Sequence, residues 1–255
     1  MHVRVLVCLL TILATPLLAP AAPPAANVPA IVQAAAQTAA STSAGAVVFE
    51  RHITILASAG PAHYEQRSDA VLLMTNGAYR RIHYLWIDVN GRPLDPAQTS
   101  RRDDQNNRDL EAGKDFFKEP FDGRYLADYR YAIVPCACSG NAVDVRFSSD
   151  VHDNQHGRGD MRIDPSTGRV LALSYSPNVL PEYATGGTID ETFGEPVPGL
   201  WTTVRSDSTY VGRVLFIPGR GTVTEVLDHF HRFTDASAGE TFYRTAMLAG
   251  GESGI

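Results

Sequence analysis

The chain has 255 residues and a mass of 27.6 kDa, with 44% hydrophobic and 20% charged residues. Its 28 acidic side chains outnumber its 22 basic ones, and the net charge of −6 argues against a nucleic-acid binder, which needs a clustered positive surface. The apolar content and the lack of a sequence period exclude collagen, coiled coil and wholesale disorder.

The first residues have the layout of a secretory signal peptide. Arg4 precedes an apolar run over 5–18, and Ala19 and Ala21 supply the small residues of a cleavage site. The run is about 14 residues long, whereas a helix needs about 20 to span a bilayer. We therefore expect residues 1–21 to be removed on export, and the mature chain to be periplasmic without a membrane span.

Residues 22–46 read as an Ala- and Pro-rich leader, and 29–40 predict a short helix whose low bulk suggests a small contribution to the core. From 47 to 236 the sequence predicts one β-rich domain, because short apolar runs alternate with turn residues. The predicted strands are 46–57, 63–74, 78–89, 124–134, 142–149, 159–164, 169–176, 185–193, 200–206, 208–217 and 222–233. The last of these also fits helical spacing, and its context favours the strand.

The strand pattern and the turns point to antiparallel pairing. In 142–149, apolar Val143, Val145 and Phe147 alternate with polar residues, which is typical of a sheet with one face in water. Asn76-Gly77 is a strong hairpin motif, and Pro218-Gly219-Arg220-Gly221 also predicts a turn. We expect a mainly β fold, a curved antiparallel sheet or open half-barrel of about eleven strands with one or two covering helices.

Two segments interrupt this pattern. The polar stretch 95–123 predicts an amphipathic helix or an ordered loop, and insertions of this length often serve as lids or binding loops. Residues 237–255 are rich in Gly and Ser and predict a flexible tail.

Cys136 and Cys138 are separated by one residue. In an extended strand their alpha carbons would lie about 6.5–7 Å apart, at the upper limit for a disulfide. A disulfide, two free thiols and a metal site all remain open, and we treat the pair as a disulfide candidate.

The most enzyme-like segment is the loop from His152 to Asp160, where two histidines have the spacing of metal ligands on a helix. Asn154, Gly157 and Gly159 disfavour such a helix, so we interpret the segment as a polar hairpin loop. The sequence has no nucleophile elbow, phosphate-binding loop or dinucleotide-binding motif. We therefore expect a protein that is not an enzyme and needs no cofactor.

The aromatic residues suggest a binding surface instead. By alternation, 78–89 is apolar on both faces, with Tyr84 and Trp86 on one and Leu85 and Ile87 on the other. Such strands fit a sandwich core, a helix-covered sheet, or a curved sheet around an apolar cavity. The best ligand-binding candidates are Tyr84, Trp86, Tyr129, Tyr131 and Trp201.

The order of parts resembles the periplasmic outer-membrane lipoprotein-sorting (LolA-like) family. The resemblance covers residues 47–236 and is carried by the segments VVFERHITILAS, HYEQRSDAVLLM, AYRRIHYLWIDVNGRPLDP, GDMRIDPSTGRVLALSYSPNVLPEY, GLWTTVRSDSTYVGRVLFI and DHFHRFTDAS. It implies a half-barrel that carries acylated cargo on an apolar inner face. We expect a non-catalytic carrier of a lipid or acylated lipoprotein. The alternatives are a secreted metal-dependent hydrolase that uses the His152–Asp160 loop, and an envelope structural or interaction module that binds envelope proteins.

Overall fold

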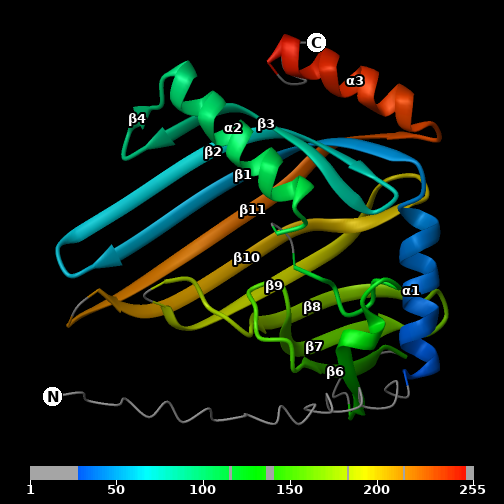
Figure 1. The fold of residues 1–255 in the computed structure, drawn as a ribbon. Helices are drawn as coiled ribbons and strands as arrows, with labels where there is room; N and C mark the ends of the chain where they lie inside the picture. The colour runs from blue at the N-terminus through cyan, green and yellow to red at the C-terminus, as the bar shows by residue number, and fades with distance from the viewer. Residues whose placement is uncertain (1–27, 115–116, 136–140, 183, 215, 251–255) are drawn as a thin grey trace, which may run out of the picture.

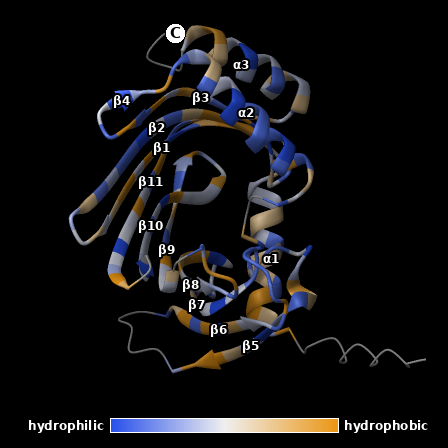
Figure 2. Cartoon of the chain, turned by 60° about the vertical axis from the view of Figure 1, so that its left-hand side comes forward, coloured by the Kyte–Doolittle hydropathy of each residue, from blue (hydrophilic) through white to orange (hydrophobic). Residues whose placement is uncertain are grey.

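One antiparallel sheet organises the chain, with its strands in the order β4-β3-β2-β1-β11-β10-β9-β8-β7-β6-β5. The computed structural model describes residues 28–114, 117–135, 141–182, 184–214 and 216–250. The strands are β1 (Ala46–Ala59), β2 (Ala62–Thr75), β3 (Ala78–Val89), β4 (Arg92–Pro93), β5 (Tyr129–Val134), β6 (Val143–Ser149), β7 (Gly157–Asp164), β8 (Arg169–Pro177), β9 (Ala184–Val197), β10 (Leu200–Val214) and β11 (Ile217–Phe233). The sheet curves strongly and stays open between its edge strands β4 and β5 (Figures 1 and 2), which confirms the predicted fold class.

Some strand boundaries differ from the prediction. The predicted strand 200–206 and the part of 208–217 up to Val214 form the single strand β10, because Asp207 keeps its place in the sheet opposite Thr224 of β11. The short strand β4 accounts for the eleventh strand. A three-residue 3₁₀ turn, Leu126–Asp128, replaces the start of the predicted strand 124–134.

The prediction of a turn at Pro218–Gly221 was wrong, because these residues belong to β11. The prediction of a strand over 222–233 is confirmed, because β11 continues to Phe233. Gly219 pairs with Ala59 on one side and with Gly212 on the other, so the glycines continue the ladder. By contrast, Asn76 and Gly77 form the predicted tight turn with φ of 49° and 71°, both in the left-handed region.

Helix α1 (Ala30–Thr42) matches the predicted helix and packs against β8 and β10. Val32 and Ala35 are almost fully buried in a core cluster on the concave face of β5–β8. The helix approaches the turn before β8 so closely that a Cβ on Gly168 would lie 2.7 Å from the Thr38 hydroxyl oxygen. Low bulk therefore permits close packing here, rather than limiting the helix to a small core contribution.

Helix α2 (Pro96–Glu111) is the helical part of the predicted insertion. It begins at a capping box in which the Asp95 carboxylate accepts from the Gln98 backbone and the Gln98 side chain accepts from the Asp95 backbone. Its side chains bind the free edge of β3. Asn107 accepts from the Ile82 amide and donates to the Ile82 carbonyl, and Asp103 accepts from the Tyr84 amide.

The prediction of a flexible tail is corrected by helix α3 (Ala236–Ala249), which the Asp235 side chain caps. Tyr243 and Ala246 are buried against Ala46 and Val48 on the convex face. The helix packs closely because it has no side chain at Gly239, where a Cβ would lie 2.4 Å from that of Ala46. The small residues that suggested flexibility thus permit a tight helix–sheet contact.

Alternation along the strands defines the two faces of the sheet. On β1, Val47 and Phe49 join the concave core cluster of β2, β3 and β11, while Val48 lies beneath α3. None of the described helices is both long and apolar enough to cross a membrane. The predicted signal peptide, residues 1–21, lies outside the described residues, as do Cys136 and Cys138.

Candidate functional site

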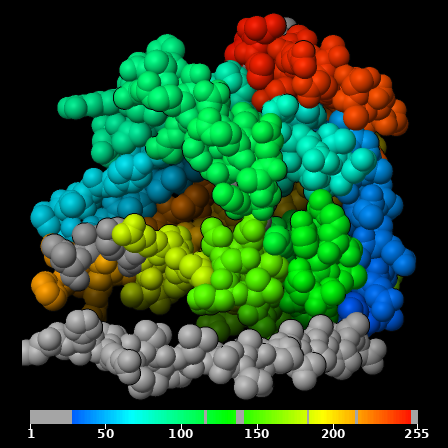
Figure 3. All heavy atoms as spheres, in the orientation of Figure 1, coloured from blue at the N-terminus to red at the C-terminus, as the bar shows by residue number. Residues whose placement is uncertain are grey.

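The concave face of the sheet contains a hollow of about 710 Å³. In Figure 3 the surface is recessed between α2 and the loops of the β5–β9 half, and atoms of β11 lie deep in the recess. Strands β1, β3 and β8–β11 line it together with the segment after α2 and the loops that flank β7 and β8. The lining residues are Arg51, Tyr79, Phe117, Glu119, His152, Asp153, Asn154, Tyr175, Pro177, Val179, Leu180, Pro181, Ile189, Glu191, Thr203, Ser206, Ser208, Tyr210, Glu225 and Leu227.

Strand register explains why these residues share one face. Ser206 of β10 lies directly opposite Glu191 of β9 and Glu225 of β11. Leu227, two residues beyond Glu225, lies opposite Arg51 of β1. Directly paired residues point to the same side of a sheet, so these side chains converge on the hollow.

Part of the lining is apolar. The Phe117 ring stacks on Tyr175 with a centroid separation of 3.7 Å, and Ile189 lies opposite Tyr175 on the neighbouring strand. Glycine makes room for the Tyr210 ring, because a Cβ on Gly187 would lie 2.4 Å from it. These residues present a continuous apolar surface on the β8–β10 side of the hollow.

Two half-buried carboxyl groups, those of Glu119 and Glu191, contribute to the polar part of the lining. Burial raises the pKa of Glu119 to about 8, and the nearby Glu191 carboxylate adds to the shift. Burial likewise raises the pKa of Glu191 to about 7, although Glu191 accepts hydrogen bonds from Thr203 and Tyr175 at 3.2 Å each. Both shifts favour the protonated carboxyl, because the hollow solvates a carboxylate less well than water does.

Arg51 is a third unusual group. Its side chain is buried on the concave face, and its Nε atom has no hydrogen-bond partner among the described residues. One terminal nitrogen donates to the Tyr84 hydroxyl at 3.4 Å, a long hydrogen bond. The hollow therefore contains a buried guanidinium with spare hydrogen-bonding capacity, so it is not the uniformly apolar cavity that the sequence led us to expect.

The structure separates the predicted ligand-binding residues Tyr84 and Trp86. The β2–β3 register shifts between the pairs Asp69–Trp86 and Ala70–Tyr84, so Leu85 is an extra residue in β3. Tyr84 stays on the concave face and contacts Arg51, whereas the Trp86 indole nitrogen donates to Asp69 at 2.5 Å. Alternation alone placed both on one face, and the bulge turns Trp86 to the convex side.

The other three candidates are covered by the chain itself. The hydroxyl of Tyr129 donates to the carbonyl of Lys118, and that of Tyr131 donates to the carbonyl of Pro120 at 2.6 Å. The Trp201 indole donates to the Val170 carbonyl at 2.7 Å. None of the five candidates is among the residues that line the hollow, and their contact with a ligand stays a prediction.

The His152–Asp160 loop does not gather a metal site. His156 is almost completely buried, and its two ring nitrogens contact Asp153 at 2.9 Å and Asp128 at 3.3 Å. Asp160 pairs with Arg146 on the neighbouring strand. The loop joins β6 to β7 as a polar connection, and only its early residues His152, Asp153 and Asn154 reach the hollow.

Sequence reasoning missed Arg51, Glu191 and Glu225 as residues of the hollow. Arg51 was the easiest to find, because it follows Val47 and Phe49 with the same alternation and interrupts an otherwise apolar face. The two glutamates lie opposite Ser206 only because β9 and β11 both pair with β10 in this register. No local pattern specifies that alignment.

No family model matches the chain, and no curated protein matches it. Solved structures with a similar fold include a DUF1329 family protein from Desulfovibrio piger, at 12% identity over 84% of this chain and 99% of that one, with a TM-score of 0.38. A putative outer membrane lipoprotein-sorting protein domain from Vibrio parahaemolyticus is 10% identical over 84% and 97%, with a TM-score of 0.44. A LolA superfamily protein from Nitrosomonas europaea is 10% identical over 79% and 93%, with a TM-score of 0.34. Two of these three solved structures carry names of the lipoprotein-sorting group that the sequence resembles.

Proposed function

We propose that the protein is a non-catalytic periplasmic carrier that holds a lipid or an acylated lipoprotein in the hollow of its concave face. The observation that carries this proposal is the hollow of about 710 Å³, which the side chains of the described residues leave open. Pockets for small molecules typically measure about 300–1,000 Å³. The predicted signal peptide supports export, which places the hollow in the compartment where lipoproteins travel.

The lining favours an amphiphile over a purely apolar ligand. Burying an acyl chain gains about 0.8 kcal/mol per methylene, and the apolar side of the hollow around Tyr175 and Ile189 offers that burial. Arg51 and the half-buried Glu119 and Glu191 line the same hollow and suit the polar part of such a molecule. The acyl chain would supply most of the affinity, and the polar groups would set its orientation.

Native mass spectrometry of protein purified gently from periplasm tests the proposal. We expect a fraction of the protein to carry a mass increment that organic extraction releases as a lipid, and the stripped protein to take up a fluorescent fatty acid. Repeated recovery of bare protein that takes up no fluorescent fatty acid would overturn the proposal. A lipid that is hydrolysed during the incubation would favour the hydrolase alternative.

A further inference from the structure

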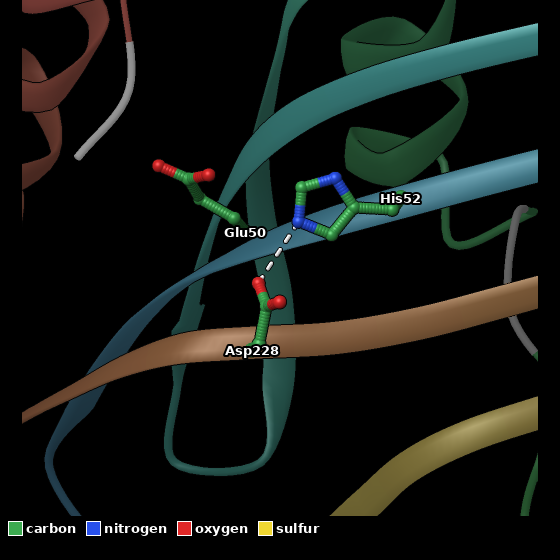
Figure 4. Close-up of side chains that lie close together, drawn as sticks. All are labelled: Glu50, His52 and Asp228. Carbon is green, nitrogen blue, oxygen red and sulfur yellow. Dashed lines mark hydrogen bonds and ion pairs between the residues drawn. The ribbon is translucent and has the colours of Figure 1, made fainter. Parts of the chain in front are cut away.

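A cluster of histidines and carboxylates lies on the convex face of β1 and β11, away from the hollow. One ligand atom each from Glu50, His52 and Asp228 lies within 4.8 Å of the others. Figure 4 shows the His52 ring joined to the Asp228 carboxylate by a hydrogen bond, with the Glu50 side chain beside this pair. None of these residues lines the hollow, so the carrier function leaves them unexplained.

A β-bulge assembles this cluster. The β1–β11 register shifts between Val48 and Glu50, so that Glu50 lies opposite Asp228 and the next residue, His229, is an insertion in β11. His229 has a φ of 48°, a conformation that few non-glycine residues adopt. Its Nδ1 atom lies 3.3 Å from a Glu50 carboxylate oxygen and 3.9 Å from one of Asp228.

Two carboxylates fix the orientation of the His52 ring. Its Nδ1 atom lies 2.6 Å from Asp69, and its Nε2 atom lies 2.9 Å from Asp228. The other Asp69 oxygen accepts from the Trp86 indole, which fixes that carboxylate in turn. With its proton on Nδ1, His52 would direct the Nε2 lone pair toward the other two ligands, the second-shell arrangement that is common around protein-bound zinc.

The carboxylates around His52 also favour the binding of a cation. The carboxylates of Glu50, Asp69 and Asp228 lie against the His52 and His229 rings, so three acidic groups gather at this point of the convex face. Every ion pair of Asp69 and Asp228 within the described chain is with a histidine. Glu50 is also among the few charged residues that are buried.

We propose that Glu50, His52 and Asp228 form a binding site for a divalent transition-metal ion, with zinc as the best fit and His229 as the adjacent fourth ligand. Mixed imidazole and carboxylate ligands suit zinc, whereas magnesium and calcium prefer oxygen ligands throughout. Ligands of a tetrahedral zinc ion lie about 3.4 Å apart, so the cluster needs only small side-chain movements. The site is open to solvent, because the His52 and Asp228 side chains are 35% and 44% exposed.

The ion would act structurally. It would cross-link β1 and β11, which are the first and last long strands of the chain and are neighbours in the sheet. The site lies beside a small recess that Glu50 lines together with Phe242 and Ala246 of α3. The site lies on the opposite face from the hollow and does not supply a metal to it. Zinc binding is therefore expected to raise the melting temperature without preventing ligand uptake.

The test uses chelator-treated protein that carries no polyhistidine tag. We expect equilibrium dialysis against ZnCl₂ to give one zinc per chain, and cobalt(II) to give the visible bands of a four- or five-coordinate site. His52→Gln and Asp228→Asn should each weaken zinc binding at least tenfold. The matched control is His63→Gln, which removes an exposed histidine of β2 outside the cluster and should leave binding unchanged.

Unchanged zinc binding in folded Asp228→Asn and His52→Gln would overturn the proposal, as would a wild-type chain that takes up no zinc. Weaker binding in His63→Gln would mark the uptake as adventitious and would also overturn it. If His52→Gln fails to fold, Asp228→Asn carries the test because it preserves side-chain size. The cobalt spectrum of the wild-type chain needs no variant at all.

Discussion

The protonation of the two glutamates in the hollow, Glu119 and Glu191, is coupled to the stability of the fold. Burial raises the pKa of Glu119 to about 8 and that of Glu191 to about 7, against 4.5 for an exposed glutamate. Between about pH 4.5 and pH 8 the unfolded chain therefore releases protons that the folded chain retains. The free energy of unfolding should fall as the pH rises through this window, and these two groups should have no further effect above it.

Replacing both groups should flatten this pH dependence. In the double variant Glu119→Gln/Glu191→Gln, neither side chain can ionise, so most of this decline, several kcal/mol for two pKa shifts of this size, should disappear. Urea denaturation at intervals from pH 5 to pH 9 measures it. Glu182→Gln, at an exposed position, should keep the wild-type profile. Parallel profiles for the double variant and the wild type would show that the carboxyls are hydrated in the folded state.

The variant Arg51→Met tests whether the buried guanidinium stabilises the fold or binds the ligand. Burying a charge that has no ion-pair partner among the described residues costs stability, and an apolar residue of similar length is often neutral or better. Arg51→Met should therefore change the free energy of unfolding by less than about 1 kcal/mol, because Tyr84 keeps its hydrogen bond from Asn106 at 3.0 Å. Uptake of the fluorescent fatty acid should weaken in the same variant. A large loss of stability would assign Arg51 a structural role instead.

At the scale of single residues, the alternation of apolar and polar residues predicted which face of the sheet most side chains occupy. It failed where a β-bulge inserts an extra residue into a strand. It correctly separated Tyr84 from Leu85, but the bulge at Leu85 sent Trp86 to the other face. A bulge depends on pairing with the neighbouring strand, so a single strand sequence does not reveal it. The same limit applies to His229, whose inserted position creates the convex cluster.

Among the elements, α2 protects an edge of the sheet. An unpaired edge strand exposes backbone groups that promote aggregation, and only the end of β3 pairs with β4. Asn107 imitates a strand partner by bonding both backbone groups of Ile82, at 3.0 and 2.9 Å. The insertion that resembled a lid in sequence therefore stabilises the sheet through its helical part.

Removing this contact should expose the edge. Asn107→Ala leaves the amide and carbonyl of Ile82 without their partners, which should cost about 2–4 kcal/mol. Chemical denaturation measures the loss, and the Ile82 amide should exchange with solvent faster than in the wild type. Gln105→Ala is the matched control, because Gln105 is exposed on the same helix and bonds only to its helix neighbours. Equal protection of Ile82 in both variants would contradict the assigned role.

The helices and strands that could be predicted from the sequence are those with a clear local pattern. Most strands and the turn at Asn76-Gly77 were predictable, because alternation and turn residues are local features of the sequence. Helix α3 was not, since its stability depends on tertiary packing of Tyr243 and Ala246 against β1 and β2. The composition of this segment resembles a flexible tail, and only its contact with the sheet distinguishes it.

For the whole molecule, the curvature of the sheet and the pairing of its first and last long strands determine where chemistry gathers. Pairing of β1 with β11 places Arg51 beside Leu227 in the hollow and Glu50 beside Asp228 on the opposite face. These contacts join residues more than 170 positions apart, as the His52–Asp228 hydrogen bond illustrates. The open curved sheet was predictable from the strand pattern, but the positions of both candidate sites were not.

A bulky residue inside the hollow tests this architecture directly. Ser206 lies opposite Glu191 and Glu225 on the concave face of β10, so Ser206→Trp should occupy the space that we assign to the ligand. Thr209→Trp is the matched control, because Thr209 is exposed on the convex face of the same strand. Both variants add the same ring to one strand, and only the first adds it to the hollow.

Titration with the fluorescent fatty acid distinguishes the two variants. We expect Ser206→Trp to weaken uptake at least tenfold, which corresponds to about 1.4 kcal/mol of binding free energy. Thr209→Trp should bind as the wild type does, and the melting temperatures of both variants should show that each remains folded. If Ser206→Trp binds normally, the ligand does not enter the hollow and the carrier must use another surface. Equal loss in the two variants would instead indicate a general disturbance of β10, because the added ring would then act without regard to the face on which it lies.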